Sequence, residues 1–490
     1  MIRDYTILHI SDLHKPHTAN YDNLFASLCI DCEHYTANGL KKPEIIVVSG
    51  DLVEGSRETD YAVAEQEIKK QYEEIGEFLC NLVGYFLDGD KRRIIIVPGN
   101  HDFFRGISAN SMVKESVVNA TDVQEKREQM INGQTRWNWK DLSFYSIKDI
   151  ELYKSRFHLF VDFYNNFYSG LEPKRAWSEP CEEYSQIVDL PEYNICFFGL
   201  NSCYKLDHLN VSGSICPQAI TTNQRKLNSI AKRGSLIVGV WHHHTAGLPY
   251  EDNYLDYRIL QSLIDSNVKI GLYGHQHLTS ILNEYHDLTQ EERILLISSG
   301  SLYGSRRQLV TGCPRQYNLL SLNYGTDEVI LKLRVRKDQT NYEIPSWCES
   351  QISNSTLTEY NETIKLSTLK PEVFINEVND YVQNTQDFKW GVENVMKFAD
   401  LDRATCLKFA DSYLSKVSDP DFVMEHIIQP ETDEQFVYLL RAAIEKREKS
   451  VIYRLTGDER YNRIPGALMN FLKEEVDKIL QLWMKEADSI

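Results

Sequence analysis

This 490-residue sequence has fewer positive than negative charges, no long apolar run and no two C-x-x-C pairs that could hold a metal together. Its 53 lysines and arginines face 71 aspartates and glutamates, and the net charge of −18 provides no overall field that attracts nucleic acid or anionic lipid. No apolar run approaches the roughly 20 residues that span a bilayer, and no basic region followed by an apolar core opens the chain. We therefore expect a cytoplasmic protein without a membrane span.

Other absences exclude whole classes of chemistry. The ten cysteines are scattered, and only Cys29 and Cys32 have C-x-x-C spacing, on a predicted helix without a second pair. We interpret the cysteines as reduced and mostly structural, not as a zinc or redox site. The sequence contains no G-x-S-x-G nucleophile elbow and no G-x-x-x-x-G-K-[ST] phosphate loop. A serine hydrolase of that type and a P-loop nucleotidase are excluded.

Short β-branched runs alternate with helical stretches up to about residue 337, which is typical of strands buried in an α/β sheet. The predicted strands are 6–10, 45–48, 94–97, 195–200, 236–240, 270–273, 294–297, 317–322 and 329–335. Most of the first seven end in polar residues that include Asp, His, Asn or Gly. In an open α/β sheet, the ligand crevice lies at such strand ends.

The remaining segments suggest a division into domains. Residues 105–185 lack strand runs and are expected to form an inserted helical cap, with an amphipathic helix over 147–168. Residues 341–370 are polar and are expected to form a linker between a domain of residues 1–340 and an all-α domain of residues 371–490. The predicted C-terminal helices are 371–383, 390–399, 404–417, 434–447 and 466–487. This helical domain suits homo-oligomerisation or binding of a protein partner.

Five sets of polar residues follow predicted strands in chain order. They are Asp12-Leu13-His14, Gly50-Asp51, Gly99-Asn100-His101-Asp102, His242-His243-His244 and Gly274-His275-Gln276-His277. Carboxylate, imidazole and amide groups together suit borderline divalent ions such as Mn²⁺, Fe²⁺, Zn²⁺ or Ni²⁺. The side chains needed for two adjacent ions are present. Gly50, Gly99 and Gly274 are expected to allow the sharp turns that aim the following residues into one site.

These motifs, in this order, resemble the calcineurin-like metallophosphoesterase superfamily, whose signature is D-x-H, G-D, G-N-H-D/E, H and G-H-x-H. The resemblance covers about 337 residues and implies a four-layer α/β sandwich, with two central β-sheets flanked by helices, ahead of the helical domain. It also implies two divalent metal ions as cofactors. Mn²⁺ is the expected metal, and Fe, Zn or Ni are the alternatives. The implied ligands are Asp12, His14, Asp51 and His277 for the first ion and Asp51, Asn100, His242 and His275 for the second, with Asp51 as the bridge.

The resemblance further implies that His101 binds no metal and contacts the phosphoryl group or protonates the leaving oxygen. Asp102 is expected to orient His101, and the alternative is that Asp102 only caps the turn. The family's fourth motif usually reads His-His-Pro, whereas this chain has three histidines before Thr245. Position at the strand end favours His242 over His243 as the ligand, and His244 is a candidate for facing the substrate.

The implied reaction is hydrolysis of a phosphodiester or phosphomonoester by a hydroxide that bridges two metals. Candidate substrate contacts are Lys15, Arg105, Arg306 and Arg307, and Tyr303 is a candidate for stacking on a base. Two alternatives stay open: a nuclease of the same superfamily, in the role of a partner-controlled effector, and a catalytically silent module that interacts through its helical domain. The metal motif does not show which phosphate ester is the substrate, and nucleotides and nucleic acids are both possible substrates.

Overall fold

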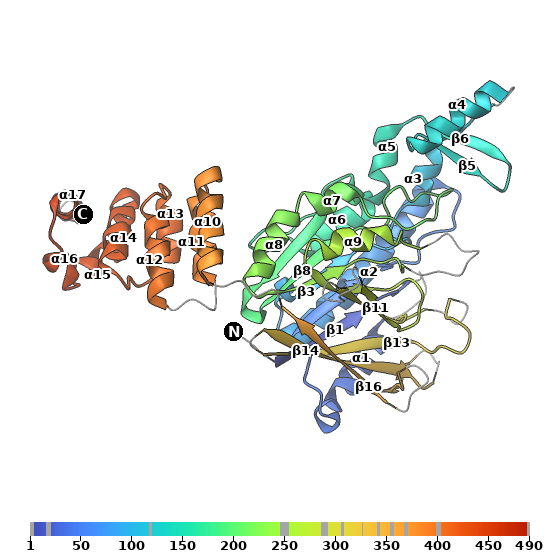
Figure 1. Cartoon of the computed structure of the whole chain (residues 1–490), viewed down its shortest axis with the longest axis horizontal. Coiled ribbons are helices and arrows are strands. Elements are labelled where there is room, and N and C mark those ends of the chain that lie inside the picture. Colours follow the sequence, from blue (N-terminus) through green and yellow to red (C-terminus); the bar gives the residue numbers. More distant parts are fainter. Residues whose placement is uncertain are drawn as a thin grey trace. The chain divides into compact units, whose positions relative to one another are not determined.

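The structure of the chain is a computed structural model. It describes residues 4–15, 21–116, 120–245, 254–285, 293–304, 308–325, 327–340, 344–352, 357–366, 371–397 and 403–487. The chain divides into two compact units, Met1–Thr368 and Leu369–Ile490. Each unit is considered by itself below, and Figure 1 labels their elements.

The first sheet of the larger unit has the order β15-β14-β13-β1-β2-β3, with β16 also paired to β14. Its strands are β1 (Asp4–Ile10), β2 (Ile45–Ser49), β3 (Ile94–Val97), β13 (Gln316–Tyr324), β14 (Glu328–Asp338), β15 (Trp347–Glu349) and β16 (Glu359–Lys365). β1, β2 and β3 are parallel, and β13 runs antiparallel to β1. The parallel pairing brings the carboxyl ends of β1, β2 and β3 to the same edge of the sheet.

The second sheet has the order β11-β12-β10-β9-β8-β7. Its strands are β7 (Ser185–Leu190), β8 (Ile195–Leu200), β9 (Leu236–Val240), β10 (Val268–Tyr273), β11 (Ile281–Tyr285) and β12 (Arg293–Ser298). Alternate residues bury on opposite faces: Phe197 and Val238 join the core shared with the first sheet, whereas Phe198 and Ile237 join a second core. Burial on both faces explains why the strands read as continuous apolar runs.

Helices cover the two sheets, which confirms the α/β sandwich. They are α1 (Asp22–Glu33), α2 (Tyr61–Leu87), α7 (Pro217–Thr221), α8 (Gln224–Lys232) and α9 (Arg258–Ile264), with short 3-10 turns η1 (Thr36–Asn38), η2 (Lys91–Arg93), η4 (Cys181–Glu183) and η5 (Pro191–Tyr193). The α2 helix begins where the Asp60 carboxylate accepts hydrogen bonds from the backbone N–H groups of Ala62 and Val63. Its long apolar face packs into the core of the first sheet through residues such as Ile75 and Leu79.

The insert at residues 105–185 is not purely helical, which corrects the expected cap. It contains α3 (Arg105–Asn110), β4 (Met112–Lys114), α4 (Ala120–Ile131), β5 (Thr135–Asn138), β6 (Ser143–Ile147), α5 (Ile150–Lys154), η3 (Ser155–Phe157) and α6 (His158–Phe167). The strands form a separate sheet of order β4-β6-β5, visible at the upper right of Figure 1. They are short and mostly half-exposed, so they lack the apolar runs that mark a buried strand.

The single helix predicted over 147–168 is also corrected, because η3 interrupts it between α5 and α6. The interruption carries Arg156 into the interior, where its guanidinium donates to the carbonyl oxygens of Tyr153 and Leu206. Arg156 also pairs with Glu182 at 2.8 Å, with both side chains buried.

Part of the expected linker at residues 341–370 belongs to the first sheet, which corrects the domain boundary. β15 pairs with the end of β14, and β16 pairs with its length from Glu328 to Arg334. Most residues of β16 are exposed or half-exposed, since the strand lies at an edge. A polar edge strand and a polar linker have the same composition, and only the pairing with β14 distinguishes them.

The second unit is helical, as expected. It contains α10 (Pro371–Thr385), α11 (Phe388–Lys397), α12 (Arg403–Leu414), α13 (Pro420–His426), α14 (Asp433–Lys446), α15 (Lys449–Thr456), α16 (Arg460–Arg463) and α17 (Ala467–Ala487). The α13, α15 and α16 helices were not predicted, because each is too short for a clear apolar period. The unit has its own apolar core, centred on Phe436, Leu440 and Val476. Across the described residues, no helix is long and apolar enough to cross a membrane.

Candidate metal centre

The turns that follow β1, β2, β3, β9 and β10 meet at one edge of the sandwich. Backbone hydrogen bonds connect them: Asp12 N–H donates to Gly50 O at 3.1 Å, His14 N–H to Asp51 O at 3.0 Å and Gly274 N–H to His242 O at 3.1 Å. The polar side chains predicted from the five motifs therefore converge, although Asp12 and His277, which are in contact, are 265 positions apart in sequence (277 − 12).

One group of possible ligands consists of Asp12, His14 and His277, whose ligand atoms lie within 4.8 Å of one another. The Nε2 atoms of His14 and His277 are 2.9 Å apart, and His277 Nε2 lies 3.2 Å from Asp12 Oδ1. The other ring nitrogen of His277 lies 2.6 Å from the carbonyl oxygen of Gln308, and this contact orients the ring.

A second group gathers on the other side of Asp51. His242 Nε2 lies 3.2 Å from Asp51 Oδ2 and 3.0 Å from Asn100 Oδ1, and His275 Nδ1 lies 2.9 Å from the same amide oxygen. The Nδ1 atom of His242 lies 2.8 Å from Ser49 O, so Nε2 is the nitrogen presented to Asp51 and Asn100. Ser49 and Gln308 act through backbone carbonyls, which no side-chain motif could have identified.

Asp51 lies between the two groups. Its Oδ2 atom lies 3.2 Å from His242 Nε2 and 3.8 Å from His14 Nε2. Burial alone would raise the pKa of Asp51, but the imidazoles of His242 and His101 hold it well below its usual range. Asp12 behaves alike: burial opposes ionisation, and the neighbouring His277 and His14 hold its pKa well below the ordinary value. Both carboxylates are therefore anionic at neutral pH.

The imidazole pKa values differ across the site. Burial would lower the pKa of His242, but the carboxylate of Asp51 raises it to about 9. Burial and the neighbouring His242 lower the pKa of His275 to about 4. His275 is therefore neutral near pH 7, whereas His242 holds a proton that a divalent cation would replace beside the two anionic carboxylates.

A further observation indicates that these residues suit two divalent ions. Asp12 Oδ1 is buried without a hydrogen-bond partner. Because His277 Nδ1 donates to Gln308 O, a neutral His277 presents a lone pair on Nε2, 3.2 Å from Asp12 Oδ1. Unsatisfied acceptors that converge in this way are costly unless a cation lies among them.

The backbone is strained where it presents these side chains. Asp12, His14, Asp51, His275 and His277 all have positive φ values, between 41° and 73°. Such φ values cost non-glycine residues free energy and cluster at functional sites.

The glycines of the motifs serve two different purposes, which corrects the prediction that all three allow sharp turns. Gly50 has φ +95°, which favours glycine. For Gly99 and Gly274 the reason is space: a Cβ on Gly99 would lie 2.2 Å from Asp51 Oδ1, and one on Gly274 would lie 2.5 Å from Asp12 Oδ2. Each of these two glycines leaves room for a carboxylate.

His101 lies beside the first group, with its ring 4.7 Å from the His14 ring. Its Nδ1 atom lies 3.0 Å from Glu54 O, and its backbone N–H donates to Asp51 Oδ1 at 2.8 Å. Because a carbonyl only accepts, Nδ1 carries the proton in this contact and Nε2 is left to exchange protons.

Asp102 does not orient His101, which corrects one prediction and supports its alternative. The Asp102 carboxylate accepts hydrogen bonds from the backbone N–H groups of Gly99 and Leu52, and from the hydroxyl of Tyr72 at 3.0 Å. It therefore joins the turn after β3 to the turn after β2. Burial and the nearby Asp51 raise the pKa of Asp102 to about 7.

Of the three consecutive histidines, His242 is the one that reaches Asp51 and Asn100. His243 Nδ1 instead contacts the Ser202 hydroxyl at 2.8 Å, and burial lowers its pKa well below the ordinary value. The ring of His244 packs against Tyr273. These contacts are consistent with His242 as the ligand candidate. They do not support a role for His244 in contacting substrate.

Two of the expected substrate contacts have other partners in the structure. Lys15 is buried and pairs with Glu74, and Tyr303 packs against Tyr21 and under Arg315. Arg105 is exposed and lines a cavity that His101 also lines. Arg306 and Arg307 lie outside the described residues. Lys15 and Tyr303 are therefore explained by packing.

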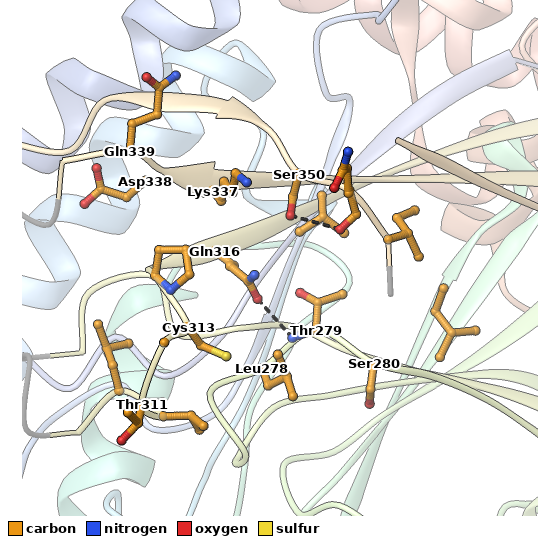
Figure 2. A pocket seen from close by; sticks show the side chains of 18 residues that line it. Leu278, Thr279, Ser280, Thr311, Cys313, Gln316, Lys337, Asp338, Gln339 and Ser350 are labelled. Atoms are coloured by element: carbon orange, nitrogen blue, oxygen red, sulfur yellow. Dashed lines mark hydrogen bonds between the residues drawn. The ribbon is translucent and has the colours of Figure 1, made fainter. Parts of the chain in front are cut away.

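Two cavities lie near these motifs. One of ≈ 460 Å³ is lined by His101, Gln308, the loop at 54–58 and residues 103–106. A larger one of ≈ 1280 Å³ begins at Leu278, next to His277, and extends to the ends of β14 and β15. Figure 2 shows its polar lining, including the hydrogen bond from the Thr279 backbone to Gln316. Only the smaller cavity includes a residue of the motifs, namely His101.

Comparisons with known proteins find a matching family model and solved structures of low sequence identity. A family model described as calcineurin-like phosphoesterase matches residues 5–278. Among solved structures, a dimetal phosphatase from Danio rerio is 10% identical, with a TM-score of 0.38, and the match covers 75% of this chain and 100% of that one. The calcineurin-like phosphoesterase YfkN from Bacillus subtilis is 12% identical, with a TM-score of 0.25, and the match covers 79% and 98%. A search of curated protein sequences finds no match.

Proposed function

We propose that this chain, which belongs to the calcineurin-like phosphoesterase family, hydrolyses a phosphodiester or phosphomonoester with two divalent metal ions. The observation that carries the proposal is the shared carboxylate of Asp51, which lies between two groups of nitrogen and oxygen ligands. Two adjacent cations repel each other strongly unless an anion lies between them, and a buried aspartate in that position supplies one. A silent interaction module has no need of this arrangement.

Asp12, His14, Asp51 and His277 would hold one ion, and Asp51, Asn100, His242 and His275 the other. When bound, the ions supply Lewis acidity toward the phosphoryl oxygens and lower the pKa of a water molecule. Mn²⁺ is the proposed metal, because the ligands are nitrogen and oxygen atoms without a thiolate. We also propose a cytoplasmic location, in keeping with ten cysteines that form no disulfide in the described part of the chain.

His101 is the proposed general acid. Glu54 O holds the proton on Nδ1, so protonation at Nε2 produces an imidazolium that can give this second proton to the leaving oxygen. The carbonyl stabilises the imidazolium through the same hydrogen bond. Asp102 contributes indirectly, because it fixes the turn from which Asn100 and His101 project.

A metal-reconstituted substrate panel tests the proposal. The purified full chain is loaded with Mn²⁺, Zn²⁺, Ni²⁺ or Fe²⁺ and assayed on bis-p-nitrophenyl phosphate, p-nitrophenyl phosphate, cyclic nucleotides, and single- and double-stranded DNA. Asp51→Asn is expected to lose at least about 100-fold in rate, since it removes the shared charge. Asp477→Asn, the same change at an exposed position of α17, is the control and is expected to keep full activity. Cleavage of no ester with any metal would refute the proposal, and selective cleavage of DNA would identify a nuclease.

A further inference from the structure

The ≈ 460 Å³ cavity beside His101 has walls of unusual composition for a phosphate-ester site. They are formed by the loop at 54–58, the first half of α2 and residues 103–106. Phe103 and Phe104 are buried and supply an apolar floor together with Ile68. The volume is that of a pocket for one small organic group.

Among the described residues that line this cavity, three are negatively charged and two are positively charged. Glu54, Glu58 and Glu67 line it, against Arg57 and Arg105. The Arg57 side chain is 97% exposed and its guanidinium lies 3.9 Å from Glu54, so it partly neutralises a carboxylate and reaches mainly into solvent. Glu67 is held in the wall, because its carboxylate accepts a hydrogen bond from the Ser56 hydroxyl at 2.6 Å. An anionic group that entered here would face a net negative lining.

One buried side chain, Gln71, holds the loop that forms this wall in place. Its Oε1 accepts hydrogen bonds from the backbone N–H groups of Glu54 at 3.1 Å and Gly55 at 3.2 Å, and its Nε2 donates to Gly55 O at 2.9 Å. The segment that Gln71 holds is the one whose Glu54 carbonyl orients His101. Cavity and proposed acid are therefore positioned by the same loop.

We infer that this cavity receives the leaving alcohol of the substrate, and that this alcohol is uncharged or cationic and aromatic or nucleoside-like in size. The inference rests on the proposed function, in which His101 gives a proton to the leaving oxygen. A hydroxide oxygen forms a new bond to phosphorus as the P–O bond to the alcohol breaks. The electron pair of the broken bond stays on the alcohol oxygen, and the proton from His101 Nε2 neutralises that oxygen. The neutral alcohol then lies against Phe103 and Phe104. A polyphosphate or a nucleic-acid strand that continues beyond the scissile bond would place further negative charge beside Glu58 and Glu67.

Matched aryl esters test this inference. The 4-carbamoylphenyl, 4-carboxyphenyl and 4-(aminomethyl)phenyl phosphates and their methyl diesters are compared by phosphate or phenol release from the metal-loaded chain. The carbamoyl and carboxyl groups are nearly the same size and differ in charge. The wild-type kcat/KM is expected to be at least about fivefold higher for the carbamoyl ester than for the carboxyl ester.

Removing the charges of the cavity should remove this preference. The double variant Glu58→Gln/Glu67→Gln is expected to bring the ratio to within about twofold of one, and its glutamine at position 67 can still accept from Ser56. Glu77→Gln, an exposed position further along α2, is the control and should leave the ratio unchanged. Binding of the product alcohols 4-hydroxybenzamide and 4-hydroxybenzoate, measured by ligand-observed NMR, gives a readout that does not depend on turnover.

The outcomes separate the two proposals. Equal rates for the neutral and anionic esters, or a preference that the double variant keeps, would overturn the inference while the phosphoesterase function stands. Cleavage of no ester would refute the proposed function, and in that case tighter binding of the amide alcohol, lost in the double variant, would still support an acid-lined cavity for neutral alcohols. Equal binding of both alcohols without turnover would overturn both.

Discussion

The Nε2 atoms of His14 and His277 face each other at 2.9 Å across the edge where the two sheets meet. Because the Nδ1 proton of His277 is donated to Gln308 O, the Nε2 atom of a neutral His277 carries a lone pair 3.2 Å from Asp12 Oδ1, and a cation would satisfy both acceptors. Their approach therefore predicts a metal-dependent stability. Saturating Mn²⁺, at about 100 times its dissociation constant, is expected to stabilise the first unit by about 2.7 kcal/mol, and EDTA should reverse this. His277→Ala should bind one ion fewer by elemental analysis, whereas His34→Ala, at an exposed position, should bind as the wild type does. Equal metal content in His277→Ala and wild type would contradict the assignment.

Gly99 should tolerate no side chain. A Cβ at this position would lie 2.2 Å from Asp51 Oδ1 and 2.5 Å from the Asp51 backbone nitrogen. Gly99→Ala is therefore expected to cost about 1–3 kcal/mol of stability and to abolish stoichiometric metal binding. Gly84→Ala is the matched control, because nothing lies within 4 Å of its Cβ and it occupies the interior of α2. It should stabilise the chain by about 0.5–1 kcal/mol. Thermal unfolding and elemental analysis of both variants decide the matter.

The buried ion pair of the insert should be costly to break on one side. Arg156 and Glu182 lie 2.8 Å apart with almost no exposure, and Arg156 also donates to two carbonyl oxygens. Arg156→Met leaves Glu182 buried without its partner and is expected to cost about 3–5 kcal/mol in urea unfolding. Lys154→Met breaks the more exposed pair with Glu151 and should cost less than about 0.5 kcal/mol. Similar losses in the two variants would show that Arg156 contributes no more than a surface charge.

Glu179 predicts a stability that falls as pH rises. Burial and the nearby Asp162 raise its pKa from 4.5 to about 7, and its Oε1 atom is buried without a hydrogen-bond partner. The folded chain therefore holds this proton more tightly than the unfolded chain, and the penalty develops between about pH 4.5 and pH 7. After allowance for solvent screening, Glu179→Gln should stabilise the chain by about 1 kcal/mol at pH 8 and by nothing near pH 4.

The measurement is the difference in unfolding free energy between Glu179→Gln and wild type across that range. Glu172→Gln, at an exposed site in the same loop, should show no pH-dependent difference. A gain for Glu179→Gln that is the same at both ends of the range would point to packing and not to ionisation.

In the second unit, Thr432 should control the start of α14. Its hydroxyl accepts a hydrogen bond from the Gln435 backbone at 3.0 Å and donates to Asp411 on α12 at 2.8 Å. Thr432→Ala is expected to destabilise this unit by about 1–2 kcal/mol. Thr456→Ala, near the end of α15, removes a hydroxyl that bonds only within its own helix and should cost much less. Phosphoesterase activity in both variants reports whether the first unit responds.

The convergence of the candidate ligands could be predicted from sequence, because these residues follow strand ends. Asp12, Asp51, Asn100, His242 and His275 each follow an apolar run, and parallel strands place their carboxyl ends together. The same reasoning failed for Asp102, whose neighbour in sequence is His101 but whose partners are Tyr72, Leu52 and Gly99. Adjacent positions in a tight turn point in different directions, and spacing does not show which.

Local pattern by itself determined the buried strands, the order of the motifs, the residue types of the centre and the helical character of the C-terminal part, because burial and ligand chemistry leave marks within a few residues. The tertiary structure alone decided that β15 and β16 extend the first sheet, that β4, β5 and β6 form a small sheet of their own, and that His243 contacts Ser202 while His242 reaches Asp51. The pairing of an edge strand and the contacts of a buried imidazole are determined by a partner that is distant in sequence. Such pairings depend on the shape of the whole fold, which short-range periodicity does not encode.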